Sequence, residues 1–206
     1  MKKESQVIFD KNVIEFVTVA AEFCAFLERA ESMKRSTFVD TTLKILPLLY
    51  LKASMLPKCE MIGDESPETY VTEEIYEVLR INLASILAEK DDYLEVFLPD
   101  MAYSDEPIKK NISEDLADIY QDIKDFIFVF QLGLNETMND SLAICQENFG
   151  LLWGQKLVNT MRALHDVKYS PKARGEDEEE EEYEPENNED CHCEDDHCHC
   201  HDHGCH

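Results

Sequence analysis

The spacing of the apolar residues is the feature that most constrains how this chain can fold. From about residue 7 to about residue 167 they recur at every third or fourth position, which is the period of an α-helix with one buried side. We predict helices over about 7–29 and 38–56, a third starting after Thr72, a fourth between Ser113 and Gly133, and a fifth from Asn135 to about 166. No segment shows sustained strand alternation with turn signals on both sides. The sequence therefore predicts an all-α protein whose body, residues 1–168, is a single antiparallel bundle of about five helices.

Residues at the expected helix ends support these boundaries. Thr72 and Ser113 are good N-caps, and Gly133 suits a helix C-terminus. Glu73 and Glu74 would place negative charge at the positive end of the third helix.

The apolar stripes comprise Phe9, Val13, Phe16, Val17, Ala20, Cys24 and Leu27 in the first helix, Ile75, Val78, Leu79, Leu83, Ile86 and Leu87 in the third, Leu116, Ile119, Tyr120, Ile123, Ile127 and Phe130 in the fourth, and Met138, Leu142, Cys145, Phe149, Leu152, Leu157, Met161 and Leu164 in the fifth.

The second helix contains a proline within an unusually apolar stretch, ILPLLYLKASML (residues 45–56). Pro47 lacks an amide donor and its ring clashes with the preceding turn, so we expect a kink there. A helix that is apolar on nearly all sides fits a central position in the bundle. The alternative is a groove that the kink exposes.

The helical pattern weakens between residues 89 and 110. We interpret DDYLEVFLP (91–99) as a short helix and MAYSDEPIKKN (101–111) as a loop. The aromatic and sulfur-containing residues Tyr93, Phe97, Met101 and Tyr103 would cover one end of the bundle, or else form an exposed patch.

The character of the chain changes abruptly near residue 168. From Glu176 to Asp190 eleven of fifteen residues are acidic, and such a segment cannot bury enough apolar surface to offset its ordering entropy. We predict a disordered acidic linker over 169–190, followed by a Cys/His-rich tail over 191–206. The net charge of −26 is shared equally between residues 1–170 and the rest. Acidity in both parts argues against nucleic acid and against an anionic membrane surface as partners.

Three segments together resemble a known family: VDTTLKILPLLYLKASMLP (39–57), the acidic helix start at 72–76, and LWGQKLVNTMRALH (152–165). The chain over about 7–168 is similar to an uncharacterised bacterial all-helical family known only as domain of unknown function 5063. The resemblance implies a single helical domain. It implies no catalytic residues, and it does not include the tail.

The body carries no enzyme signature. A carboxylate-bridged di-metal site in a bundle needs two Glu-x-x-His pairs, but the body has one histidine, His165, preceded three positions earlier by Arg162. We interpret His165 as a favourable partner for a helix C-terminus. The isolated cysteines Cys24, Cys59 and Cys145 lack any metal-ligand spacing, and the first and last of these fall on apolar stripes, where cysteine acts as a small hydrophobic residue.

The tail, in contrast, is dense in metal ligands. Its eleven donors are Cys191, His192, Cys193, His197, Cys198, His199, Cys200, His201, His203, Cys205 and His206. Thiolate and imidazole ligands together suit zinc, nickel or copper and disfavour magnesium and calcium. Zinc fingers space their ligand pairs differently, whereas Cys-x-Cys spacing resembles that of metallothioneins and the histidine-rich end resembles the tails of nickel metallochaperones.

These features predict a cytoplasmic protein without enzymatic activity whose tail binds a transition-metal ion for buffering or delivery. The start of the chain shows no signal peptide, and no stretch approaches the length of a membrane span. We expect no organic cofactor. A protein client is a possible partner besides the metal ion. The alternative is a helical interaction or adaptor domain that carries an incidental metal-binding tail, since such low-complexity tails can bind metal without using it.

Overall fold

The computed structural model describes residues 7–95 and 108–170 of the 206-residue chain. Its helices are α1 (Lys11–Glu28), α2 (Arg35–Ser54), α3 (Glu73–Leu87), α4 (Ile112–Gln131), α5 (Asn135–Asn148) and α6 (Gly154–Tyr169), with short 3₁₀ turns at Val7–Phe9, Ala30–Ser32 and Ala88–Lys90, a π-helical turn at Phe149–Trp153, and two strands, β1 (Asp92–Leu94) and β2 (Lys109–Asn111). The predicted all-α bundle is confirmed. The predicted linker (169–190) and tail lie outside the described residues, apart from the last residue of α6 and Ser170.

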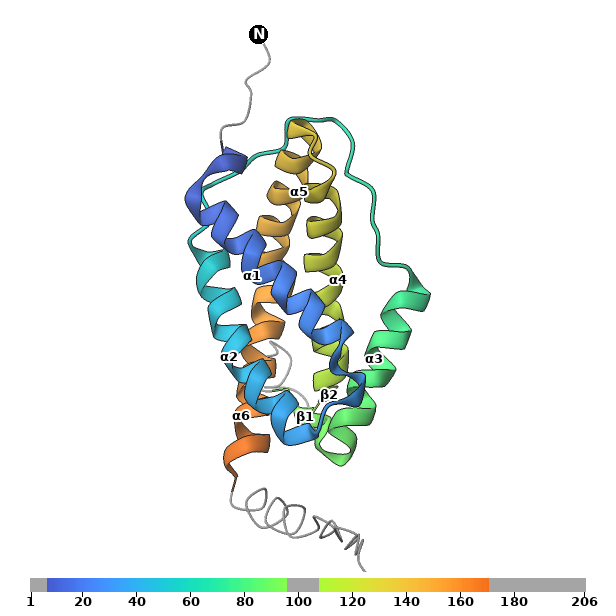
Figure 1. Cartoon of the computed structure of the whole chain (residues 1–206). Helices are drawn as coiled ribbons and strands as arrows, with labels where there is room; N and C mark the ends of the chain where they lie inside the picture. The colour runs from blue at the N-terminus through green and yellow to red at the C-terminus, as the bar shows by residue number, and fades with distance from the viewer. Residues whose placement is uncertain (1–6, 96–107, 171–206) are drawn as a thin grey trace, which may run out of the picture.

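Helix α4 is the centre of the bundle. It packs against α1, α3, α5 and α6. Helix α2 packs mainly against α1 and α6, and most of it lies on the side of the bundle away from α3 (Figure 1). Twelve residues of α4 are buried. The aromatic core lies where these helices meet, with the Phe16 ring 5.5 Å from that of Phe126 and 6.5 Å from that of Trp153. The part of the chain that the structure describes has no helix long and apolar enough to span a membrane.

Several helix ends follow the predicted local rules. The Thr72 hydroxyl accepts a hydrogen bond from the Ile75 amide at the start of α3, and the Asp10 carboxylate accepts one from Asn12 at the start of α1. Gly133 ends α4 with a φ of +76°, a conformation that glycine adopts without penalty. The predicted first helix is shorter than expected because Asp10 separates a 3₁₀ turn from α1.

The prediction that Ser113 caps α4 is wrong. The helix begins one residue earlier, and both Ser113 donors bond the carboxylate of Asp91: the amide at 2.7 Å and the hydroxyl at 2.6 Å. The capping group thus comes from a residue 22 positions earlier in the chain. Sequence-local capping rules cannot detect a cap supplied from another element.

The predicted fifth helix exists, but it contains a π-helical turn. The Gly154 amide donates to the Phe149 carbonyl, five residues back, and a Cβ on Gly154 would lie 2.3 Å from that oxygen. The wider turn changes which side chains face the core. Trp153 is therefore fully buried and Leu152 is 52% exposed, which corrects the predicted stripe. Phe9 and Val78 are also exposed rather than buried.

The apolar stretch around Pro47 is not central. Leu46, Leu49 and Ala53 face the core, whereas Leu48 and Leu51 are 43% and 51% exposed. Helix α2 runs through Pro47 at the edge of the bundle and, among the described residues, packs on one side against α1, α3 and α6. Its apolar outer face is an exposed surface, not a groove.

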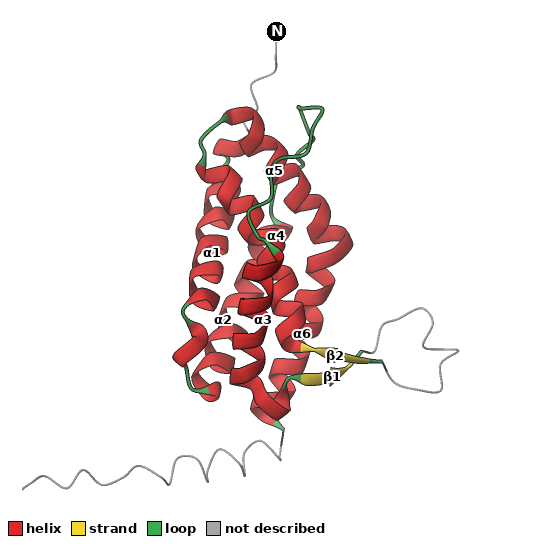
Figure 2. Cartoon of the chain, turned by 90° about the vertical axis from the view of Figure 1, so that its right-hand side faces the viewer, coloured by secondary structure: helices red, strands yellow, loops and turns green. Residues whose placement is uncertain are grey.

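A two-stranded antiparallel ribbon replaces the predicted short helix near residue 92. Tyr93 of β1 pairs with Lys110 of β2 (Figure 2). Each strand has three residues. This is too few to show the alternation of apolar and polar residues that predicts a strand. Tyr93 packs against the core as predicted, and Phe97, Met101 and Tyr103 lie outside the described residues.

Candidate functional site

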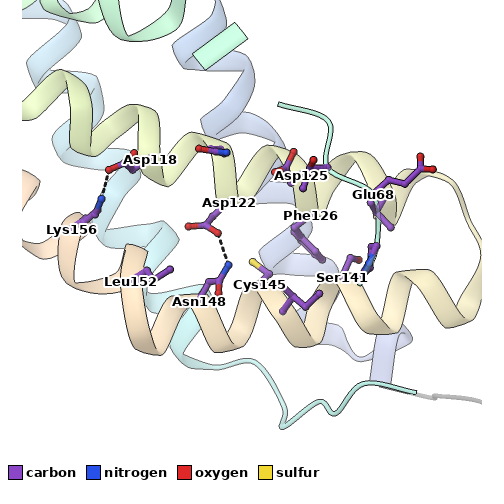
Figure 3. Close-up of a pocket in the computed structure, with 15 residues that line it drawn as sticks. Glu68, Asp118, Asp122, Asp125, Phe126, Ser141, Cys145, Asn148, Leu152 and Lys156 are labelled. Carbon is purple, nitrogen blue, oxygen red and sulfur yellow. Dashed lines mark hydrogen bonds and ion pairs between the residues drawn. The ribbon is translucent and has the colours of Figure 1, made fainter. Parts of the chain in front are cut away.

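A cavity of about 410 Å³ lies between α4 and the helix formed by α5, the π-helical turn and α6. Its floor is apolar and includes Phe126, Val129 and Cys145, each at most 3% exposed. Carboxylates of α4 line one wall, and the amide of Asn148 faces them from α5 (Figure 3). We call this cavity, with its lining residues, the acidic groove.

The wall of the groove arises from a regular spacing of aspartates. Asp115, Asp118, Asp122 and Asp125 are separated by three, four and three residues, so a helix places them on one side. This acidic stripe runs beside the apolar stripe of α4, and Asp118, Asp122 and Asp125 line the cavity. Sequence reasoning missed these residues because it scored only the apolar period. The D-x-x-D-x-x-x-D-x-x-D spacing is the signal that could have found them.

Two of the three lining carboxylates of α4 are held by protein donors. Asp118 accepts a hydrogen bond from the Tyr76 hydroxyl at 2.8 Å and forms an ion pair with Lys156. Asp125 accepts the amides of Tyr70 and Val71 at 2.7 and 2.8 Å. Both acids therefore fix neighbouring segments in place.

Asp122 differs from its neighbours. Its carboxylate accepts one hydrogen bond, from Asn148 Nδ2 at 2.6 Å. Burial raises the pKa of this carboxyl above its ordinary value, and the Asn148 contact only partly opposes the rise. A carboxylate offers about four acceptor positions, so Asp122 keeps acceptor capacity toward the cavity.

The crossover segment, residues 55–72, joins α2 to α3 and passes along the groove, where Glu68 contributes to the lining (Figures 1 and 3). Side chains of α5 hold its backbone: Gln146 bonds Leu56, Pro57 and Cys59, and Asp140 accepts the amides of Ile62 and Gly63 at 2.7 and 2.8 Å. The segment has no regular secondary structure, and these bonds satisfy backbone groups that a helix would satisfy internally.

A second acidic site lies at the N-terminal end of α4. Asp115 is 4% exposed and accepts the Tyr93 hydroxyl at 2.5 Å. Burial raises the pKa of its carboxyl to about 6. Together with Asp91, it links the strand pair to α4. No cavity is needed to explain these two acids, because each meets donors from the fold itself.

The cysteines and the histidine of the body do not form a metal site. Cys24 and Cys145 are buried among apolar residues, as predicted, and burial raises the pKa of the Cys24 thiol to about 12. The Cys59 thiol contacts the side chain and the carbonyl of Asn139. His165 lies on the exposed side of α6 with its ring 4.6 Å from that of Tyr169. Within residues 7–95 and 108–170, no group of three or more His, Cys, Asp or Glu side chains is arranged to hold a metal ion. All eleven predicted metal ligands lie in the tail, outside the described residues.

The model of one protein family, described as domain of unknown function (DUF5063), matches residues 7–170. This chain belongs to that family. The match confirms the resemblance found in the sequence, and it ends before the Cys/His-rich tail. A crystal structure of a Bacteroides fragilis protein is 93% identical and superimposes with a TM-score of 0.75, over 82% of this chain and 99% of that one. No curated protein matches the chain. The DUF5063 domain is therefore the helical body.

Proposed function

We propose that this DUF5063 protein binds a transition-metal ion, such as zinc, nickel or copper, through its tail and serves in metal buffering or delivery. The observation that carries the proposal is the density of ligands: eleven thiol and imidazole groups within sixteen residues. Thiolates and imidazoles are the ligands that borderline and soft ions prefer. At four ligands per tetrahedral ion, the tail holds at most about two fully ligated ions.

The acidic residues around the ligands support this role. Glu194, Asp195, Asp196 and Asp202 lie among the donors, and the acidic linker precedes them. Their negative field concentrates cations near the tail and offsets part of the ion's charge. The same field raises the pKa of the thiols, so metal uptake releases protons and weakens as the pH falls.

The helical body needs no metal in this proposal. Its described residues form a continuous apolar core and hold no metal-ligand cluster. The body would act without catalysis in the cytoplasm, as the part that contacts a protein client while the tail carries the ion.

Zinc titration calorimetry under reducing conditions at neutral pH tests the proposal. The wild-type chain should take up one to about two equivalents. Replacing Cys191, Cys193, Cys198, Cys200 and Cys205 with serine should remove the tightest binding and leave weaker binding by histidine. Cys59→Ser, in the body, is the matched control and should bind as wild type. Zinc affinity should fall by orders of magnitude toward pH 5. Imidazoles, with an ordinary pKa of about 6.5, and thiols, with an ordinary pKa of about 8.5, keep their protons at that pH.

Two results would contradict the proposal. Equal zinc uptake by the wild type, the five-serine variant and a chain truncated after Ser170 would place the metal in the body. Loss of helical circular dichroism on chelation would mean that the body requires metal to fold.

One observation favours the alternative, an interaction domain with an incidental tail: the family match covers residues 7–170 and not the ligand-rich segment. If most DUF5063 proteins end without Cys/His-rich tails, metal handling cannot be the function that the family shares. The exposed apolar face of α2, with Leu48 and Leu51, would then be a natural contact surface.

A further inference from the structure

The acidic groove has the dimensions and lining of a small-molecule site. Its volume of about 410 Å³ falls within the range of ligand pockets, which combine a mainly apolar lining with a few polar groups that fix orientation. Phe126, Val129 and Cys145 supply the apolar floor, and Asp122 is a polar group one turn before Phe126 on α4 (Figure 3).

The charges of the groove define the ligand that would fit. Among the described lining residues Lys156 is the one cationic side chain, and Asp118 pairs with it. Asp125 accepts two backbone amides on one oxygen, Oδ1, and these neutral donors leave its charge in place. Asp122, Asp125 and Glu68 therefore give the lining a net negative charge, which favours a cationic ligand.

A metal ion is a poorer fit than an organic cation. Asp118, Asp122 and Asp125 span about 10 Å along the helix at 1.5 Å per residue, and two of them are committed to protein donors. They do not converge on one point, and the described residues contain no metal-ligand cluster. The apolar floor offers no ligand atoms to a metal ion, whereas the hydrocarbon part of an organic cation would bury apolar surface against it.

We propose that the acidic groove binds a small organic amine, with the protonated amine on Asp122 and the Asn148 amide oxygen, and the apolar part of the ligand on Phe126, Val129 and Cys145. Asn148 already donates its Nδ2 to Asp122, which leaves its oxygen available as an acceptor for a second amine hydrogen. The raised pKa of Asp122 fits a carboxylate whose charge is better stabilised by a cation than by the protein alone. The proposal is independent of metal binding by the tail.

The protein has a built-in reporter for this site. Trp153 is the single tryptophan of the chain, is fully buried, and donates its indole N–H to the carbonyl of Cys145, a floor residue. A ligand on the floor should therefore change tryptophan fluorescence as well as produce heat in a titration.

The test titrates the full-length protein with 2-phenylethylamine, with the neutral analogue 2-phenylethanol, and with the anionic analogue 3-phenylpropanoate. The amine should bind and change the Trp153 emission, and the alcohol and the acid should bind at least about tenfold more weakly, because they lack the charge-assisted hydrogen bond. Asp122→Asn keeps the size of the side chain and should weaken amine binding by about 10- to 100-fold.

Glu147→Gln is the matched control, because Glu147 precedes Asn148 in α5, is exposed, and does not line the groove. It makes the same change in net charge and should leave amine binding unaltered. Equal binding of the three probes, no binding of the amine, or an equal loss in Glu147→Gln and Asp122→Asn would each overturn the proposal. Saturable binding of Mg²⁺ that Asp122→Asn abolishes would also overturn it, in favour of a metal site.

Discussion

Two acidic sites on one helix contrast in what surrounds them. At the N-terminal end of α4, Asp91 receives an amide and a hydroxyl from Ser113, and Asp115 receives the Tyr93 hydroxyl. Half a helix further on, Asp122 receives one amide hydrogen and borders a cavity. The same residue type is structural where the fold supplies its donors, and is available to a ligand where the fold supplies too few. The contrast depends on partners from distant segments, not on the helix itself.

The largest expected difference is in stability. Asp91→Ala leaves the buried Ser113 amide and hydroxyl without their acceptor, so we expect it to lower the free energy of unfolding by about 3 kcal/mol. Asp122→Ala removes one hydrogen bond beside a cavity that water can enter, and should cost only about 0.5 kcal/mol. Urea denaturation of both variants measures the difference. Similar losses for the two would show that the two sites do not differ in kind.

The pH dependence of stability should separate the sites further. The pKa of Asp115 is about 6 in the folded protein against an ordinary value of 3.8, so the folded state binds the proton more readily than the unfolded chain. Asp115 therefore contributes stability that is fully present below pH 3.8 and is lost as the pH rises through 6. Each pH unit between these limits is worth about 1.4 kcal/mol.

The wild type minus Asp115→Asn difference isolates this contribution, since Asn keeps an oxygen for the Tyr93 hydroxyl. Relative to the variant, the wild type should gain stability as the pH falls from 7 to 5. A difference that stays flat over this range would mean that Asp115 is not the buried carboxyl described. Measurements of urea midpoints at both pH values are sufficient.

The last comparison concerns the backbone turns that flank the two sites. Ala88, three residues before Asp91, has a φ of +48°, whereas Gly133, which follows α4 at its other end, has a φ of +76°. Ala88→Gly should stabilise the protein by about 1 kcal/mol and Gly133→Ala should destabilise it by about the same amount. Thermal unfolding of the two variants should give shifts of opposite sign. Shifts of the same sign would be inconsistent with the two backbone conformations.

The sequence predicted what depends on neighbours along the chain. The apolar period located five helices, and Thr72 and Gly133 marked a start and an end because their effects are local. The Asp91 cap of α4 and the pairing of Tyr93 with Asp115 join residues 22 positions apart. No local rule connects them, so the cap was misassigned and the strands were missed.

The candidate sites divide in the same way. The metal ligands of the tail lie close together in the sequence, so composition alone indicates them. Metal binding by the tail stays a prediction. The acidic groove combines α4, α5 and the crossover segment, and its wall could have been suspected from the aspartate spacing. The partners that distinguish Asp122 from Asp118 and Asp125 come from other elements, and only the tertiary structure shows them.

The π-helical turn has a consequence for how this domain tolerates insertions and deletions. An α-helix advances by about 100° per residue, and the wide turn absorbs one additional residue without changing the alignment of the core-facing sides of α5 and α6. Deleting one residue such as Gly150, around which a Cβ would meet open space, would let the turn become ordinary α-helix. Leu157 and Leu164, both fully buried, would then keep their places in the core. In an alignment of related sequences, a single-residue gap at this position would therefore mark a regular helix in the same bundle, whereas a gap inside α6 would rotate the residues that follow it by more than a quarter turn.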